Sequence, residues 1–136
     1  MEKEITFTVP ILKNHSSLRE LLLDKNLAGL GDSYVNFVYS LAMSQKYKRP
    51  IGAKVNNQVL AKAVEMSGVR RFLPHRVDRH TRGNAAEALL VVSWLQGKQE
   101  LDHCIKVLSE KEDLTEAFAI LLREILEKLG GFHGDK

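Results

Sequence analysis

The sequence has few of the features that mark secreted or membrane proteins. Cys104 is the single cysteine, so no disulfide can form within the chain and nothing points to an extracellular, disulfide-held fold. No stretch of about 18 uninterrupted apolar residues is present, so we expect no membrane span. Met1 to Glu4 lead into no long apolar region, and we therefore expect no signal peptide. These absences leave a cytoplasmic protein as the default.

Internal repeats, low-complexity segments and linkers are also absent. Of the 136 residues, 27% are charged and 44% are hydrophobic, which is ordinary for a globular protein and argues against disorder. This length favours one domain with a real core, which we place at residues 15–131. Residues 1–14 differ in pattern from the rest of the chain, because apolar and polar side chains alternate from Ile5 to Val9, before Pro10. We expect a short extended arm there.

Helical periodicity dominates from Ser16 onward. The first short helix has Ser16 or Ser17 as its cap with Glu20 completing a capping box, and it breaks at residues 24–26. Further helices are predicted at roughly 31–48, 57–67, 84–96, 98–109 and 113–129, with Met66 on an inward face. We expect Cys104 in the core, and Trp94 either in the core or at a dimer contact. The sequence thus predicts an all-α fold of about six helices.

Two of the predicted helices are strongly apolar, and each carries one acid near its start. Asp32 precedes the apolar run 34–42, and Glu87 lies within the apolar run 84–95. One interpretation is structural: Asp32 is an N-cap, and Glu87 completes a capping box with Asn84. The other is that the two helices pack side by side and their acids converge. Such a pair of carboxylates binds Mg²⁺ or Mn²⁺ through hard oxygen ligands.

Residues 70–82 form a basic segment, with five arginines and two histidines against one acid. They show no apolar period, so we predict a loop or a broken helix. Because arginine binds phosphate bidentately and aromatic residues are few here, the segment favours contact with the backbone of a duplex. The predicted RNA-binding residues are Arg70, Arg71, His75, Arg76, Arg79, His80, Arg82 and Lys54.

Two other interpretations of the basic segment are open. Its arginines could instead pair with acids of helix 113–129 on a solvated surface. A metal site formed by His75, Asp78 and His80 is less favoured, because their spacing matches no compact ligand pattern.

The residues Leu30-Gly31-Asp32-Ser33, followed about fifty residues later by Glu87-Ala88-Leu89-Leu90, resemble the catalytic domain of ribonuclease III. The layout is most similar to Mini-III ribonucleases, which consist of that domain without a double-stranded-RNA-binding domain. The resemblance covers about residues 26–108.

This resemblance implies a homodimeric, all-α endonuclease that uses Mg²⁺ (or Mn²⁺) to hydrolyse phosphodiesters in double-stranded or structured RNA. Asp32 and Glu87 would be its catalytic, metal-binding carboxylates, and the apolar helix 34–42 would form the dimer interface. Lys25, Ala28 and Asn84 stand where full-length relatives carry acids, although Asn84 can still offer a carbonyl oxygen to a metal. The alternatives are a weakly active or non-catalytic RNA-binding module of the same fold, and a plain helical dimer whose acids are caps.

Overall fold

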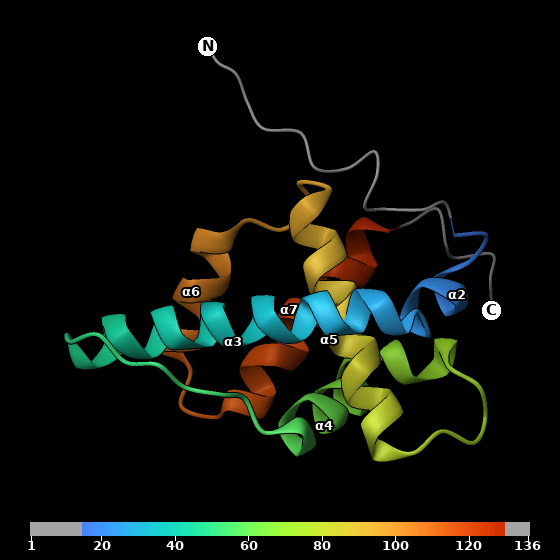
Figure 1. The fold of residues 1–136 in the computed structure, drawn as a ribbon, viewed down its shortest axis with the longest axis horizontal. Helices are drawn as coiled ribbons and strands as arrows, with labels where there is room; N and C mark the ends of the chain where they lie inside the picture. Colours follow the sequence, from blue (N-terminus) through green and yellow to red (C-terminus); the bar gives the residue numbers. More distant parts are fainter. Residues whose placement is uncertain (1–14, 130–136) are drawn as a thin grey trace, which may run out of the picture.

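The computed structural model describes residues 15–129, and within them it contains six α-helices and one short 3₁₀-helix (Figure 1). The elements are α2 (Leu18–Leu22), α3 (Lys25–Tyr47), α4 (Asn57–Ser67), η1 (Val69–Phe72), α5 (Arg79–Leu95), α6 (Leu101–Glu110) and α7 (Leu114–Lys128). The prediction of an all-α fold with about six helices is confirmed. The arm predicted for residues 1–14 lies outside the described residues.

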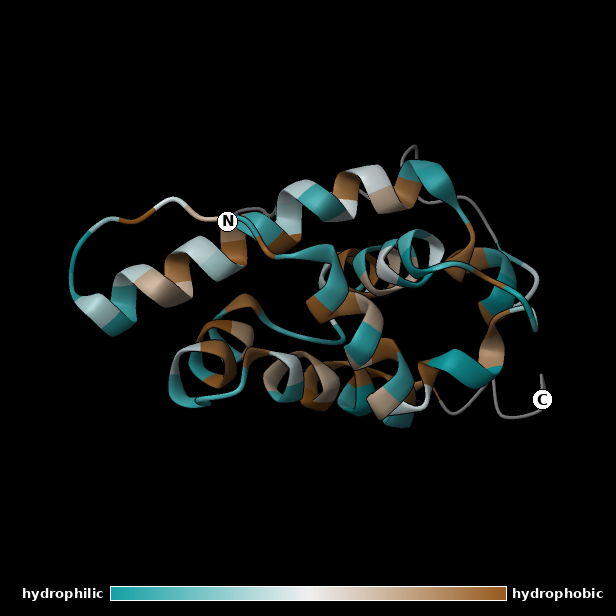
Figure 2. Ribbon diagram, turned by 90° about the horizontal axis from the view of Figure 1, so that it is seen from below, coloured by the Kyte–Doolittle hydropathy of each residue, from teal (hydrophilic) through white to brown (hydrophobic). Residues whose placement is uncertain are grey.

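Helix α5 is the centre of the domain. It packs against α2, α3, α4 and α7, and its residues 85–93 are all buried. Helix α3 runs across most of the width of the molecule and crosses α5 (Figure 1). Hydrophobic residues gather where the helices face one another, and hydrophilic residues lie along their outer turns (Figure 2). None of the described helices is long and apolar enough to cross a membrane.

The long helix α3 begins six residues earlier than predicted. Asp24 is its N-cap, because its Oδ1 accepts hydrogen bonds from the backbone N–H groups of Asn26 (3.0 Å) and Leu27 (3.1 Å). Residues 24–26 therefore start a helix instead of only breaking the previous one. Asp32 lies two turns inside α3, so the interpretation of Asp32 as an N-cap is wrong.

Helix α5 also begins earlier than predicted. Asp78 caps it, since its Oδ1 accepts a hydrogen bond from the Thr81 N–H at 2.8 Å. Glu87 consequently lies in the third turn, and a capping box between Asn84 and Glu87 is wrong. The end of the helix agrees with the prediction, because α5 stops at Leu95 shortly before a glycine of positive φ.

The remaining helices lie where they are predicted, except that α6 begins at Leu101, three residues after its predicted start at 98. Ser17 is confirmed as the cap of α2, with its hydroxyl accepting from the Glu20 N–H at 3.2 Å, while the Glu20 carboxylate accepts from the backbone N–H of Ser16. Helix α4 has its predicted bounds and stops at Gly68, where φ is 98°. Met66, expected to face inward, is 45% exposed. The basic segment is a broken helix, formed by η1, a connection and the first turn of α5.

Candidate functional site

Helices α3 and α5 approach each other very closely at Gly31. A Cβ atom placed on Gly31 would lie 2.1 Å from the carbonyl oxygen of Glu87 and 2.9 Å from its Cβ. Only glycine allows this approach, because any larger side chain would overlap the backbone of α5. Gly31 is adjacent to Asp32, so this crossing brings the two acids of the prediction to the same place.

The two acids line one pocket of about 680 Å³ between the helices. Asp32 follows Lys25, Ala28 and Gly29 along one face of α3, at the three- and four-residue spacing of a helical stripe. Glu87 ends the matching stripe on α5. The complete lining is Lys25, Ala28, Gly29, Asp32, Asn57, Asp78, His80, Thr81, Asn84 and Glu87. Asp32, Asn84 and Glu87 thus lie together, as the metal-site interpretation requires.

Burial and a second carboxylate perturb Glu87. Glu87 is 8% exposed, and the pKa of its carboxyl group is raised from 4.5 to about 8. Burial is the largest cause, followed by a hydrogen bond to Asp32 and repulsion by the Asp32 charge. At neutral pH the pair therefore retains a proton in the absence of a cation. A divalent cation between the two carboxylates would favour their ionised forms.

The donor set of this pocket is small. Among residues 15–129 no group of three or more His, Cys, Asp or Glu side chains could hold a metal ion. The set of His75, Asp78 and His80 considered from the sequence is therefore not formed. The lining includes the carboxylates of Asp32, Asp78 and Glu87 and the amides of Asn57 and Asn84. Asp78 caps α5, and Asp32, Glu87 and Asn84 are the candidate ligands. This fits Mg²⁺, which protein sites commonly hold through one or two carboxylates while it keeps several waters.

Two arginines of the basic segment hold the protein's own backbone. The guanidinium of Arg70 donates to the carbonyl oxygens of Pro74 (3.0 Å) and His75 (2.6 Å). Arg82 donates to the carbonyl oxygen of Val77 (2.8 Å) and pairs with Glu65 of α4 (3.4 Å). Their main role in the fold is therefore to shape the connection before α5. Within residues 15–129, no ion pair joins this segment to α7.

The other predicted RNA-binding residues are exposed. Arg76, Arg79, His75 and Lys54 lie on the surface, and the exposed His80 also lines the carboxylate pocket. Arg79 and His80 are the first two residues of α5, so they lie at the end of the pocket where α5 begins.

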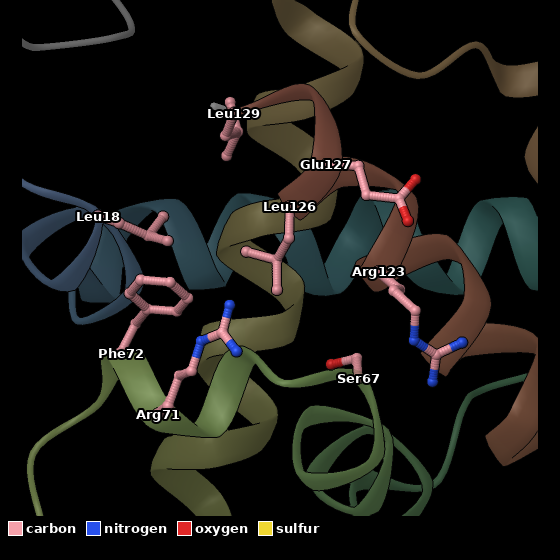
Figure 3. Close-up of a pocket in the computed structure, with 8 residues that line it drawn as sticks. All are labelled: Leu18, Ser67, Arg71, Phe72, Arg123, Leu126, Glu127 and Leu129. Carbon is pink, nitrogen blue, oxygen red and sulfur yellow. The ribbon is translucent and has the colours of Figure 1, made fainter. Parts of the chain in front are cut away.

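Arg71 belongs to a different pocket (Figure 3). This pocket of about 410 Å³ lies between α2, η1 and α7, and Arg71 and Arg123 stand on two sides of it. The Arg71 guanidinium lies 5.0 Å from the ring centre of Phe72. No residue lines both pockets, so Arg71 does not share the surroundings of the carboxylate pair.

Sequence reasoning did not find several residues of the carboxylate pocket. The sequence prediction gives Asn57 a role only as a candidate helix cap, gives Thr81 none, and treats Lys25 only as a residue in the place of an acid. Asn36 was also missed, although its Nδ2 donates to Asp32 Oδ1 at 3.3 Å. The available signal was the four-residue spacing from Asp32 to Asn36, which places both side chains on one face of the predicted helix 31–48.

Sequence comparison agrees with this architecture. The family model described as Ribonuclease III matches residues 25–131, a range that contains α3 to α7 and all the lining residues of the carboxylate pocket. The chain therefore belongs to the ribonuclease III family. A search of curated proteins gives no match to this sequence.

Proposed function

We propose that this protein is an endoribonuclease that hydrolyses phosphodiester bonds in double-stranded or structured RNA with Mg²⁺ or Mn²⁺. The observation that carries the proposal is the pair of Asp32 and Glu87 in one pocket, with the pKa of Glu87 raised to about 8. A buried acid beside a second carboxylate weakens a fold and favours a cation, which is the arrangement expected of a metal-dependent site. Membership of the ribonuclease III family supports the same reaction class.

In this proposal Asp32, Glu87 and the amide oxygen of Asn84 hold the metal ion. The ion, when bound, would stabilise charge on a phosphoryl oxygen and lower the pKa of a bound water. The chain contributes the orientation of these ligands and the low-dielectric wall formed by the buried part of α5. Lys25 adds a positive charge on the wall formed by α3, where it can contact an RNA phosphate.

The proposed RNA surface consists of the exposed cations near the pocket. His80 lines the pocket, Arg79 precedes it, and Arg76 lies in the connection before α5. Lys54 lies on the connection between α3 and α4. Contacts of this kind are made to the phosphate backbone and follow duplex shape more than sequence. We therefore propose a duplex or a structured RNA as the substrate.

We also propose that the protein acts as a homodimer through α3. Large apolar residues on and beside this helix are exposed: Leu30 is 42%, Phe37 is 56% and Trp94 is 38% exposed. They line one shallow pocket, where the rings of Tyr34 and Trp94 stack with centroids 5.1 Å apart. A second copy of this face would cover the exposed apolar area.

A cleavage assay tests the proposal. Purified protein is incubated with an RNA duplex and Mg²⁺, and compared with the variants Asp32→Asn and Glu87→Gln and with the control Asp102→Asn on α6. We expect wild type and Asp102→Asn to cleave, and both site variants to lose cleavage while they still bind RNA. Cleavage that survives in both site variants would show that the nuclease assignment is wrong. Salt-sensitive binding without cleavage by wild type would favour a non-catalytic RNA-binding module.

A further inference from the structure

Side chains of α3 form a row of hydrogen bonds with the backbone of the connection between α3 and α4. Ser44 exchanges hydrogen bonds with the backbone of Ile51, its Oγ accepting at 2.8 Å and donating at 3.2 Å. Ser40 does the same with Ala53, at 2.9 Å and 3.0 Å. We call residues 50–55 the strap. Both views of the ribbon show the chain running back beside the second half of α3 (Figures 1 and 2).

Asn36 makes the third of these contacts. Its Oδ1 accepts a hydrogen bond from the Val55 N–H at 2.8 Å. Asn36, Ser40 and Ser44 are spaced by four residues on α3, whereas their partners are alternate residues of the strap. Four helical residues rise about 6 Å and two extended residues advance about 6.5 Å, so the contacts stay in register.

Asn36 differs from the two serines because it also contacts Asp32. Its Nδ2 donates to Asp32 Oδ1 at 3.3 Å. The orientation of the amide follows from its partners: a backbone N–H only donates, so the oxygen must face Val55 and the NH₂ group must face Asp32. Asn36 thus joins the strap to one of the two carboxylates of the pocket.

A hydrogen-bond partner such as Asn36 can fix the orientation of the Asp32 carboxylate. Glu87 is buried within the packed α5, whereas Asp32 is exposed. The hydrogen bond between the two acids needs their shared proton, so it is lost when a cation ionises both, and ordering the exposed Asp32 side chain around the ion then costs conformational entropy. A hydrogen bond from a half-buried amide that is itself fixed to backbone reduces this cost.

We propose that Asn36 is a positioning residue, which holds the Asp32 carboxylate in the orientation required for metal binding and takes its own orientation from the strap. This inference rests on the proposed function, because it assigns Asn36 a role toward the metal ligand Asp32. Lys54 lies between Ala53 and Val55, so Asn36 and Ser40 together also fix the backbone that carries this exposed cation.

The serine contact supplies a matched control. Asn36→Ala removes one strap contact and the contact to Asp32, whereas Ser40→Ala removes a strap contact and leaves Asp32 untouched. Affinity for Mn²⁺ is measured without RNA, from the loss of the free Mn²⁺ signal in electron paramagnetic resonance. The Mg²⁺ concentration for half-maximal cleavage, the KM for RNA and the thermal midpoint are measured on the same proteins.

We expect Asn36→Ala to weaken Mn²⁺ binding by about 10-fold or more, as loss of an outer-sphere partner commonly does. The Mg²⁺ requirement should rise in parallel. Ser40→Ala should leave Mn²⁺ affinity within about 2-fold of wild type and change only the thermal midpoint and the KM for RNA. If Asn36→Ala does not fold, Asn36→Gln, whose longer side chain misplaces the amide, is measured with the same expectation.

Two outcomes would overturn the inference in distinguishable ways. If wild type binds Mn²⁺ and cleaves RNA but Asn36→Ala matches Ser40→Ala in Mn²⁺ affinity, Asn36 only anchors the strap and the proposed function stands. If wild type neither binds Mn²⁺ nor cleaves RNA, the proposed function fails and the role of Asn36 fails with it.

Discussion

The contact of Gly31 with the backbone of Glu87 makes a sharp prediction for Gly31→Ala. The added methyl group would lie 2.1 Å from the Glu87 carbonyl oxygen, whereas ordinary contacts begin at 3.4 Å. The obstructing atom belongs to the backbone, so α3 and α5 must separate by about 1 Å. Overpacking of this kind costs about 1–3 kcal/mol or more, against a gain of about 1 kcal/mol from replacing a helical glycine. We expect a net loss of about 2 kcal/mol.

Gly29→Ala is the matched control, since both glycines lie in α3. Nothing lies within 4 Å of a Cβ at Gly29, so this variant keeps the propensity gain of about 1 kcal/mol without a clash. The two variants should differ by about 3 kcal/mol, or roughly 10 °C in thermal midpoint by circular dichroism.

Cleavage should separate the two variants as well. Displacing Asp32 from Glu87 by about 1 Å should lower the rate by about 100-fold in Gly31→Ala. Gly29→Ala should stay near wild type. Equal stability and equal cleavage in the two variants would refute the argument that the approach of α3 to α5 at Gly31 sets the site.

Three further predictions concern charge and assembly. Without divalent cations, the thermal midpoint of wild type should fall as pH rises from about 5 to 9. Glu87 loses its proton at a pKa of about 8 in the folded protein but near 4.5 in the unfolded chain, so raising the pH through this range favours unfolding. Glu87→Gln should lack this fall, and identical profiles would contradict the assigned pKa. Phe37→Glu should shift the protein from dimer to monomer in light scattering, whereas Met66→Glu, also on an exposed apolar residue, should not. Arg79→Ala should weaken RNA binding and lower the salt slope by about 1 without destabilising the fold. Arg70→Ala, which loses two bonds to backbone carbonyls, should instead lower the thermal midpoint.

Hydrophobic periodicity and the residues that start and stop helices predicted most of the fold. Helix α4 was found with its correct bounds, because Asn56 caps its start and Gly68 adopts a positive φ at its end. The start of α3 was missed because residues 24–26 were interpreted as a break, and the start of α5 because residues 70–82 show no apolar period. Both helices also continue through glycines, Gly29 in α3 and Gly83 in α5, although glycine disfavours the helix interior by about 1 kcal/mol. Tertiary packing outweighed that local preference at both helices.

The meeting of Asp32 and Glu87 was predicted, but through the wrong geometry. The sequence suggested that two helix starts converge, whereas the acids meet where α3 crosses α5 at Gly31. Gly31 carries no local signal for this role, because a glycine in a turn and a glycine in a helix crossing look the same in one sequence. Likewise, nothing in the basic segment distinguishes Arg70, which binds backbone carbonyls, from Arg79, which is exposed.

The placement of Glu87 argues against a purely structural role for the two acids. Its neighbours in α5 are buried alanines and leucines, and an apolar residue at this position would pack without loss of hydration. The fold instead buries a carboxyl group next to the carboxylate of Asp32, and it does so where a mid-helix glycine already weakens α3. Neither acid caps a helix, so neither stabilises α3 or α5 by satisfying backbone N–H groups at a helix end. Departures from local rules that coincide at one point are expected where function, and not stability, selects the residues.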